Sequence, residues 1–411
     1  MNRSLCRSCA EPLTRTFCDL GLSPISNAFL RAGDAAKGEM FYPLRVCVCD
    51  SCYLVQLKSD LFSDAHFHED YVYFSSFSES WLEHARRYVD AMTTRFNLSE
   101  ASRVIEIASN DGYLLQYFVR AGVPCLGIEP TANTAAAARL KGIETRECFF
   151  GRQSASQLRN DGWKADLLLG NNVLAHVPDI NDFVGGMPLV LKPDGVVTLE
   201  FPHLLQLIAG NQFDTIYHEH YYYLSLTALF PVFARADLKI FDVETLTTHG
   251  GSLRIYACHA AALHIVTGSV AAILEEEAVA GLNNGATFDG FAQGVWETKR
   301  QFINFLVDAK RAQKSVAAYG AAAKGNTLLN YCGVGSDLIE FVADKNPTKQ
   351  GRLLPGSRIH VVDPQVIFDR KPDFLVVLPW NIKDEVIKQL AEVRGWGGKF
   401  VVAIPSLQVI P

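Results

Sequence analysis

Several features that would assign the chain to a membrane or nucleic-acid-binding class are absent from its sequence. No apolar run is long and uncharged enough for a transmembrane helix, and the first residues, Met1 to Cys6, lack the apolar core of a signal peptide. Basic residues are not in excess, since the net charge of the 411 residues is −6. We therefore expect a cytoplasmic protein that binds neither membranes nor nucleic acid.

Three common motifs of enzyme active sites are also missing. The HExxH pattern of helical zinc proteases does not occur, no GxGxxG dinucleotide fingerprint opens the α/β pattern, and no loop ends in the GK[ST] of a Walker A site. The chain has no internal repeat and no low-complexity tract. These absences argue against a helical zinc protease, an NAD-dependent enzyme and a P-loop protein.

The composition that remains is ordinary for a soluble globular enzyme, with 49% hydrophobic and 20% charged residues. A chain of 411 residues exceeds what one hydrophobic core usually supports. We expect three domains, with boundaries near residues 1–70, 71–262 and 263–411.

Six of the ten cysteines fall before residue 53, and four of these form two CxxC knuckles, at Cys6 and Cys9 and at Cys49 and Cys52. Each knuckle can place two thiolates on one tetrahedral ion, so the pair predicts a structural Zn²⁺ site with no open position for a substrate. A redox CxxC is the competing interpretation, but no thioredoxin-like βαβ pattern surrounds it. Zinc would compensate for a core too small to be stable alone.

Strands and helices alternate through the central region, which predicts a doubly wound parallel sheet finished by an antiparallel hairpin. Ligands of such sheets bind outside the carboxyl ends of the strands. Glu129 closes the second strand, where a carboxylate can accept both hydroxyls of a ribose, and the turn Ser109–Gly112 brings backbone near the ligand. The pattern suits an adenosyl ligand on a class I methyltransferase sheet. The predicted strands are residues 104–107, 125–129, 142–146, 165–169, 195–201, 238–246 and 252–258.

The segment Tyr217–Ser225 concentrates two imidazoles, one carboxylate and four phenols. Histidine exchanges protons near neutral pH, and active sites concentrate such titratable groups. A proton-transfer site is favoured, with a buried aromatic strand and a metal site as the alternatives. If the segment is extended, His218 and His220 point one way while Glu219 and Tyr221 point the other.

The C-terminal region predicts a second, smaller parallel α/β unit. Its first strand, residues 315–319, runs into a stretch of small residues, Gly320 to Thr327, that opens a helix and contains Lys324. Small residues, free amides and a nearby cation at a helix N-terminus suit phosphate binding. The competing interpretation is a scaffold that only supports the first sheet.

Three stretches carry a resemblance to a known family: EIASNDGYLL at 106–115, GNNVLAHVPD at 170–179 and YHEHYYYLS at 217–225. With the paired cysteine knuckles and the C-terminal portion, nearly the whole chain resembles the sugar C-methyltransferases. Those enzymes methylate a ring carbon, typically C3′, of a nucleotide-linked 4-keto-6-deoxyhexose, with S-adenosylmethionine (SAM) as donor. The resemblance implies a zinc-binding domain, a SAM-binding domain and a C-terminal Rossmann-like domain. Family members usually have Gly where this chain has Ala108.

The resemblance also implies roles for individual residues. His220 would be the base, supported by Tyr217 and Glu219; His176 would donate near the keto oxygen, and Tyr71 matches an aromatic of the same cleft. The C-terminal unit would hold the nucleotide diphosphate, most often thymidine diphosphate in this family, through Lys324, Asn326, Asp344 and Arg358. Asn171 and Asn172 either bind a ligand or cap their turn. Cofactor contacts are expected from Glu106, Ala108, Asn110, Gly112, Tyr113, Leu114, Glu129, Asn171 and Asn172.

Two other functions compete with carbon methylation. An O- or N-methyltransferase of a sugar or small metabolite needs less acid–base machinery, so the HEH cluster favours carbon. A zinc-ribbon regulatory protein is disfavoured by the acidic net charge. We expect the protein to be a monomer or a weak dimer.

Overall fold

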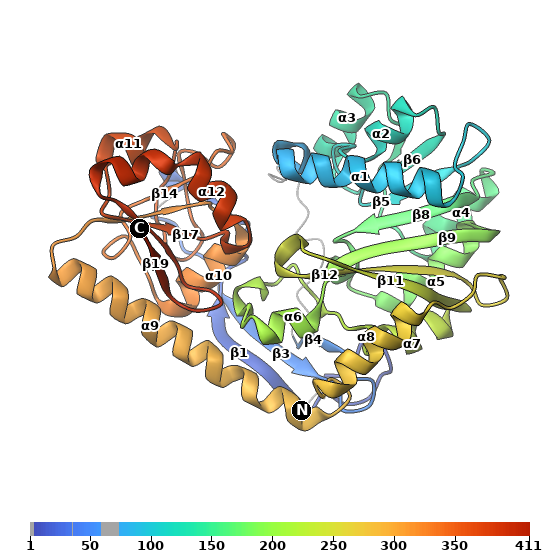
Figure 1. Ribbon diagram of the computed structural model, residues 1–411, viewed down its shortest axis with the longest axis horizontal. Helices are drawn as coiled ribbons and strands as arrows, with labels where there is room; N and C mark the ends of the chain where they lie inside the picture. The colour runs from blue at the N-terminus through green and yellow to red at the C-terminus, as the bar shows by residue number, and fades with distance from the viewer. Residues whose placement is uncertain (1–3, 35, 59–73) are drawn as a thin grey trace.

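The protein is described by a computed structural model that covers residues 4–34, 36–58 and 74–411. Its chain forms two α/β lobes that are joined at their base by a small sheet from the N-terminal region (Figure 1). Across those residues, the helices are too short or too polar to cross a lipid bilayer.

The sheet at the base belongs only partly to the N-terminal region. Gln56 of its third strand lies opposite Tyr222 of a fourth strand that follows the HEH segment. A further two-residue strand, β2 (Leu30–Arg31), pairs with β15 (Arg352–Leu353) of the C-terminal lobe. The N-terminal unit is therefore hydrogen-bonded to both lobes. In spatial order, the main sheet contains β1 (Arg15–Ser23), β3 (Tyr42–Val48), β4 (Val55–Leu57) and β10 (Tyr222–Tyr223).

The central lobe contains a seven-stranded sheet in the order β11-β12-β9-β8-β5-β6-β7. Strands β5 to β9 are parallel, and β12 runs antiparallel to both of its neighbours. This arrangement confirms the predicted class I methyltransferase sheet with its terminal hairpin. The strands are β5 (Val104–Ile107), β6 (Cys125–Ile128), β7 (Thr145–Arg146), β8 (Ala165–Asn171), β9 (Leu191–Pro202), β11 (Leu238–Leu246) and β12 (Ser252–His259).

Both faces of the central sheet are covered by helices. Along β8, Leu167 and Leu169 pack toward one set of helices and Leu168 toward the other. A strand buried on both faces needs such a continuous apolar run. One face carries α1 (Glu79–Arg95), α2 (Leu115–Arg120) and α3 (Ala132–Leu140). The other carries α4 (Arg152–Asn160), α5 (Ile180–Val190), α7 (Leu226–Arg235) and α8 (Gly268–Val279), while α6 (Leu204–Ala209) follows β9.

The C-terminal lobe is the predicted second α/β unit. Its sheet has the order β16-β14-β13-β17-β18-β19, parallel except for β19. The strands are β13 (Val316–Tyr319), β14 (Val342–Ala343), β16 (Val361–Val362), β17 (Phe374–Val377), β18 (Lys399–Val402) and β19 (Gln408–Ile410). The helices are α9 (Phe291–Arg311), which runs along the base of the molecule, α10 (Ala323–Cys332), α11 (Gln365–Arg370) and α12 (Lys383–Gln389).

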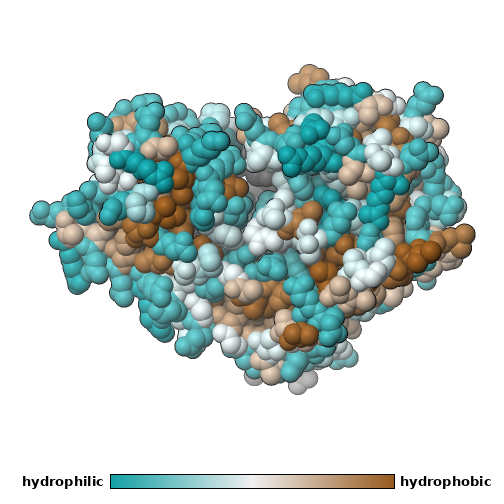
Figure 2. All heavy atoms as spheres, in the orientation of Figure 1, coloured by the Kyte–Doolittle hydropathy of each residue, from teal (hydrophilic) through white to brown (hydrophobic). Residues whose placement is uncertain are grey.

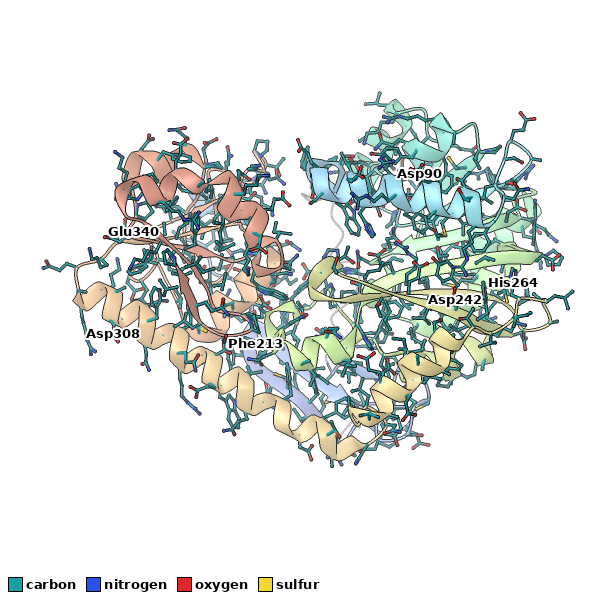
Figure 3. All side chains as sticks on the ribbon, in the orientation of Figure 1. Asp90, Phe213, Asp242, His264, Asp308 and Glu340 are labelled. Atoms are coloured by element: carbon teal, nitrogen blue, oxygen red, sulfur yellow. The ribbon has the colours of Figure 1, made fainter. Side chains whose placement is uncertain are left out.

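One hydrophobic core joins the N-terminal sheet to the C-terminal lobe. Phe17 of β1 stacks on Phe291 of α9, with ring centroids 4.5 Å apart. Phe213, which is labelled at the junction of the lobes in Figure 3, belongs to the same core. Because shared apolar burial favours a fixed packing, this core holds the lobes in one relative orientation.

Candidate active site

A cavity of about 680 Å³ lies between the two lobes. Its lining includes Asn171 at the carboxyl end of β8, Lys324 at the start of α10, and Asn27 of the N-terminal unit. The surface is hollowed between the lobes in Figure 2. The carboxyl edge of a parallel sheet is where α/β proteins bind ligands, so all three units contribute to one candidate site.

The turn after β5 forms one wall of the cavity through Ala108, Asn110 and Tyr113. Ala108 has a φ of 56°, in the left-handed region that residues with a Cβ rarely adopt. This conformation suits the glycine that the family resemblance implies at this position, and here alanine is accommodated in it. The backbone of this turn therefore borders the space where the predicted cofactor would bind.

Glu129 and Asn171 supply the polar groups that a SAM site needs. The Glu129 carboxylate lines the cavity and accepts hydrogen bonds from the backbone N–H groups of Asn110 and Thr131, both at 2.9 Å. Each carboxylate oxygen can accept more than one hydrogen bond, so ribose hydroxyls can still bind. The buried Asn171 amide has no hydrogen-bond partner within the described chain. Such an unsatisfied amide at a cavity wall fits a site that is completed by a ligand.

Three other predicted cofactor residues lie behind this wall and do not line the cavity: Glu106, Gly112 and Leu114. Burial, followed by the charges of Glu129 and Asp111, raises the pKa of Glu106 well above its usual range. Gly112 has a φ of 74°, and an added Cβ would lie 2.3 Å from Ile143 Cδ1. These residues support the turn from beneath instead of facing the cavity.

His220 lines the cavity and is held at both ring nitrogens. Its Nδ1 lies 2.9 Å from the Thr215 carbonyl oxygen, which can only accept, so Nδ1 carries the proton. In the neutral ring, Nε2 then accepts a hydrogen bond from the Tyr217 hydroxyl at 2.7 Å. Burial, followed by the nearby His176, lowers the pKa of His220 well below 6.5. The imidazole is therefore neutral at pH 7, as a general base must be.

The backbone around His220 is a turn and not the extended segment that the sequence predicts. The His220 N–H donates to the Tyr217 carbonyl at 2.9 Å, which closes the turn. As a result His218 and His220 do not share a face: the His218 ring packs against Tyr42, whereas His220 and Glu219 both line the cavity. The expectation for an extended segment was wrong because this local hydrogen bond replaces strand pairing.

Glu219 and His176 complete the polar groups around the base. Asn27 Nδ2 donates to Glu219 Oε1 at 3.0 Å, and burial raises the pKa of Glu219. The His176 ring lies edge-on to His220 with centroids 4.7 Å apart. Tyr217, Glu219, His176 and His220 thus meet in one cavity, and Tyr71 lies outside the described residues.

Sequence reasoning missed His249, which lines the cavity from the turn between β11 and β12. Its Nε2 lies 3.1 Å from Asn172 Nδ2, and its backbone has a φ of 54°. Burial, followed by the charge of Lys324, lowers the pKa of His249 to about 4. The Thr-His-Gly-Gly turn predicted a hairpin, but only the strand order could place its tip beside β8.

On the C-terminal side, Lys324 faces the cavity as predicted from its position after β13. Its Nζ donates to Asn381 Oδ1 at 2.7 Å and lies 4.8 Å above the Trp380 ring. Burial lowers the pKa of Lys324, while the charge of Asp214 opposes that shift. A second cation, Lys349, also lines the cavity and was not anticipated.

The other three predicted diphosphate ligands do not line this cavity. Asn326 is only 1% exposed on α10. The Asp344 carboxylate accepts from the backbone N–H of Ala321 at 2.7 Å, so it holds the loop before α10. Arg358 is paired with Glu39 of the N-terminal region, 2.9 Å away. Asp344 and Arg358 therefore make structural contacts, and Asn326 is buried away from the cavity.

The four knuckle cysteines, Cys6, Cys9, Cys49 and Cys52, come together at the edge of the N-terminal sheet. Their sulfur atoms all lie within 4.8 Å of one another, and two pairs are 3.6 and 3.5 Å apart. A tetrahedral Zn²⁺ with Zn–S bonds of about 2.3 Å requires S–S separations of about 3.8 Å. The residues therefore fit a closed structural zinc site, as the sequence predicts.

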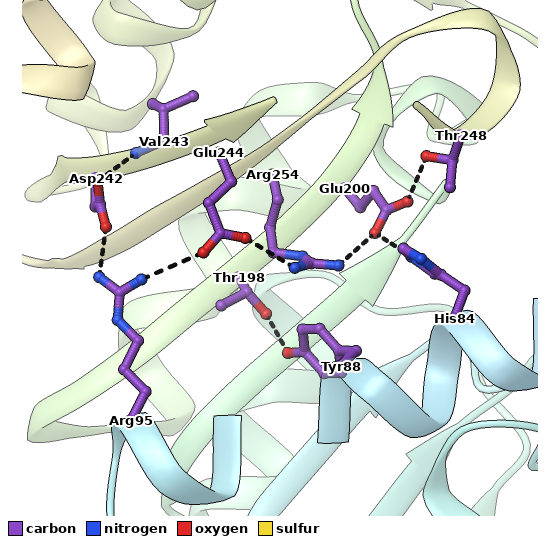
Figure 4. Close-up of polar contacts among 10 residues, drawn as sticks. All are labelled: His84, Tyr88, Arg95, Thr198, Glu200, Asp242, Val243, Glu244, Thr248 and Arg254. Atoms are coloured by element: carbon purple, nitrogen blue, oxygen red, sulfur yellow. Dashed lines mark hydrogen bonds and ion pairs between the residues drawn. The ribbon is translucent and has the colours of Figure 1, made fainter. Parts of the chain in front are cut away.

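An extended ion-pair network ties α1 to the central sheet (Figure 4). The fully buried Glu200 carboxylate accepts from Arg254 at 3.0 Å and Thr248 at 2.9 Å, and His84 Nε2 lies 2.9 Å away. Arg254 also pairs with Glu244 at 2.9 Å. Trp81 stacks on His84 and lines the cavity, so the network positions a cavity wall.

Replacing Arg254 with methionine is expected to lower the free energy of unfolding by about 3 kcal/mol, because it removes one partner of a buried charge. The control is Glu244→Gln, which affects the 40% exposed carboxylate of the same network and should cost less than about 1 kcal/mol. Urea unfolding monitored by circular dichroism measures both. Equal effects of the two variants would mean that the buried pair of Arg254 and Glu200 contributes no more to stability than the exposed Glu244 contact.

Comparison with known proteins extends over the whole chain. Family models match as "Putative zinc binding domain" over residues 6–67, "Methyltransferase domain" over 81–243 and "C-methyltransferase C-terminal domain" over 247–405. The C-methyltransferase NovU of Streptomyces niveus is 36% identical over 405 residues, which cover 98% of this chain and 96% of that protein.

Other similarities are confined to parts of the chain. The ubiquinone biosynthesis O-methyltransferase of Rhodopseudomonas palustris strain BisA53 is 28% identical over 115 residues, 28% of this chain and 46% of that protein. The crystal structure of magnesium protoporphyrin IX methyltransferase (ChlM) from Synechocystis PCC 6803 with bound SAM is 14% identical, with a TM-score of 0.34, and the match covers 43% of this chain and 79% of that one. The similarity to the C-methyltransferase alone among these three extends through both lobes and the N-terminal unit.

Proposed function

Because this chain belongs to the C-methyltransferase family and uses SAM as its methyl donor, we propose that its acceptor is the ring carbon beside the ketone, C3′, of a nucleotide-linked 4-keto-deoxysugar. The observation that carries the proposal is the neutral His220 in a cavity shared by the cofactor wall and Lys324. A carbon nucleophile needs such a base, whereas a hydroxyl or amine is nucleophilic without one.

Carbon methylation requires two chemical steps at this site. A ketone makes the hydrogen on the neighbouring carbon acidic, and His220 Nε2 would remove that proton, leaving its electron pair in an enolate. With the donor held by the turn after β5, Glu129 and Asn171, the enolate carbon would attack the methyl group, forming the C–C bond as the S–CH₃ bond breaks with its electrons remaining on sulfur. Bound SAM supplies the electrophilic methyl group. The proton on His220 afterwards passes to solvent.

The phenol and imidazole next to His220 are suited to stabilise the enolate. Tyr217 donates to Nε2 in the present arrangement, so a substrate C–H that takes this place would release the hydroxyl to donate elsewhere. His176, with its ring beside that of His220, is a second candidate donor. Donors directed at a developing oxyanion lower the barrier because they stabilise charge that forms only in the transition state. Glu219 lines the same cavity and would contact the sugar.

The nucleotide portion would lie toward the C-terminal lobe. Lys324 and Lys349 are far apart in the sequence, but both belong to the C-terminal lobe and both line the cavity. A diphosphate would compensate the two partly desolvated cations, and a cation attracts phosphate as a point charge. We place the nucleotide diphosphate against these lysines, with thymidine diphosphate as the first carrier to test.

The test uses a thymidine diphosphate-linked 4-keto-6-deoxyhexose with the complete enzyme. Without SAM in deuterated water, NMR is expected to detect deuterium entering the carbon next to the ketone, because the base acts before methyl transfer. With ¹³C-methyl SAM, the label should appear bonded to that carbon. Label on a ring oxygen or an amine would contradict the proposal and support the O- or N-methyltransferase alternative.

A further inference from the structure

The segment that carries His220 is held by side chains of the C-terminal lobe. Trp380, at the start of the short helix η8 (Trp380–Ile382), donates from Nε1 to Asp214 Oδ2 at 2.8 Å. Thr327 of α10 donates from Oγ1 to the Ile216 carbonyl at 2.9 Å. Both contacts fall within three residues, Asp214 to Ile216, although their donors are more than a hundred positions away in the sequence.

Asp214 is a buried carboxylate to which the chemistry above assigns no role. It is 0% exposed and does not line the cavity. Burial raises the pKa of Asp214 to about 6, while the charge of Lys324 and the Trp380 hydrogen bond oppose that shift. Burying a carboxylate costs free energy unless hydrogen-bond donors surround it. The position of the Asp214 carboxylate therefore depends on the hydrogen bond from the Trp380 N–H.

The next residue links this contact to the base. Thr215 supplies the carbonyl oxygen that accepts the His220 Nδ1–H, at 2.9 Å. That hydrogen bond fixes both the tautomer and the plane of the imidazole. A shift of the backbone from Asp214 to Ile216, which includes the Thr215 carbonyl, would therefore rotate the ring and redirect Nε2.

We propose that the Asp214–Trp380 hydrogen bond is a positioning contact through which the C-terminal lobe aligns the His220 imidazole for proton removal. The inference rests on the proposed role of His220 as the base. Trp380 also lies beneath the Lys324 ammonium, so one side chain contacts both the predicted diphosphate ligand and the segment that orients the base. Asp214 and Trp380 touch neither substrate nor cofactor in this scheme.

Trp380→Phe tests the contact, since phenylalanine keeps an aromatic ring near Lys324 and removes the N–H donor together with part of the indole. We expect the rate of deuterium exchange into the ketosugar without SAM to fall about 10- to 100-fold, because a small misplacement of a reacting group is costly. The KM for the ketosugar and the dissociation constant of SAM should stay within about threefold. Asp214→Ala should reproduce this loss, and the double variant should be no slower than either single variant.

Two controls and a second measurement separate positioning from general damage. Trp296→Phe changes a half-exposed indole, and Asp308→Asn changes an exposed carboxylate far from the cavity (Figure 3), so both should exchange at the wild-type rate. ¹⁵N NMR of the imidazoles, with His220 assigned from a His220→Asn spectrum, should show altered His220 signals in Trp380→Phe without any substrate.

Wild-type exchange in Trp380→Phe, or unchanged His220 signals, would overturn the proposal. If Trp380→Phe does not fold, Asp214→Ala removes the acceptor of the same hydrogen bond, and wild-type exchange in that variant would overturn the proposal equally. If even the wild-type enzyme exchanges no deuterium while the His220 signals still move, the proposed substrate or base is wrong, although the contact still orients the His220 imidazole.

Discussion

Replacing His220 with asparagine is expected to slow methyl transfer by about 10²- to 10⁴-fold, the range attributed to a positioned general base. Asparagine is also polar, but its amide is not basic near neutral pH, so it cannot take the proton that Nε2 would accept. The exchange of deuterium into the ketosugar should fall with the methylation rate, because both require the same proton removal. The dissociation constant of SAM should remain within about threefold, since the cofactor wall is formed by the turn after β5 and by Glu129.

Two other histidines serve as controls. His264 lies at the far end of the central lobe, stacked on Phe241 (Figure 3), and His264→Asn should leave the rate unchanged. His218 is two residues from the base but packs against Tyr42, so His218→Asn should lower stability more than the rate of the folded enzyme. Methylation that persists in His220→Asn would remove this residue from the role of base.

The pH dependence of the wild-type enzyme provides a check on the same assignment. Burial, followed by the charge of His176, lowers the pKa of His220 well below 6.5. A general base works only when unprotonated, so kcat/KM should stay high as the pH falls to 6.5 and decrease only below it. That acidic limb should be absent from the residual activity of His220→Asn.

The strands of the central lobe were predictable from sequence because their signals are local. Hydrophobic runs bounded by turn residues marked β5, β8 and β9, and the Thr-His-Gly-Gly turn marked the β11–β12 hairpin. The zinc site was predictable for the same reason: each CxxC knuckle fixes two ligands within four residues, and two knuckles suggest one ion. Such patterns need no knowledge of the tertiary structure.

The parts that sequence could not supply depend on contacts between distant segments. Arg358 could not be distinguished from a phosphate ligand until Glu39, 319 positions away, was found beside it. His249 and Lys349 reach the cavity only because of the strand orders of their two sheets. The prediction of an extended segment at Tyr217–His220 was wrong for a local reason. Its aromatic composition is typical of a strand, but its backbone hydrogen bond closes a turn.

Removing zinc, by a chelator or by Cys49→Ser, is expected to disorder the N-terminal sheet and reduce methyl transfer at least tenfold. Structural zinc contributes an apparent free energy of about 10–16 kcal/mol, comparable with the whole stability of a domain. The zinc content, measured with a colorimetric zinc indicator after the cysteine ligands are blocked by a thiol reagent, and the rate of methylation should fall together. Cys18→Ala is the matched control, because Cys18 is a buried thiol of the same sheet that lies outside the cluster.

The predicted loss of activity follows from the path between the zinc site and the base. The second knuckle runs directly into β4, where the Leu57 N–H donates to the Tyr221 carbonyl at 2.9 Å. Tyr221 is the residue after His220, so the strand that zinc holds in place is bonded beside the base. Gln56 of β4 also donates to Cys6 Sγ at 3.1 Å and pairs with Tyr222. Full activity in a zinc-free enzyme would mean that the lobes alone hold this segment, and that the N-terminal sheet has another purpose.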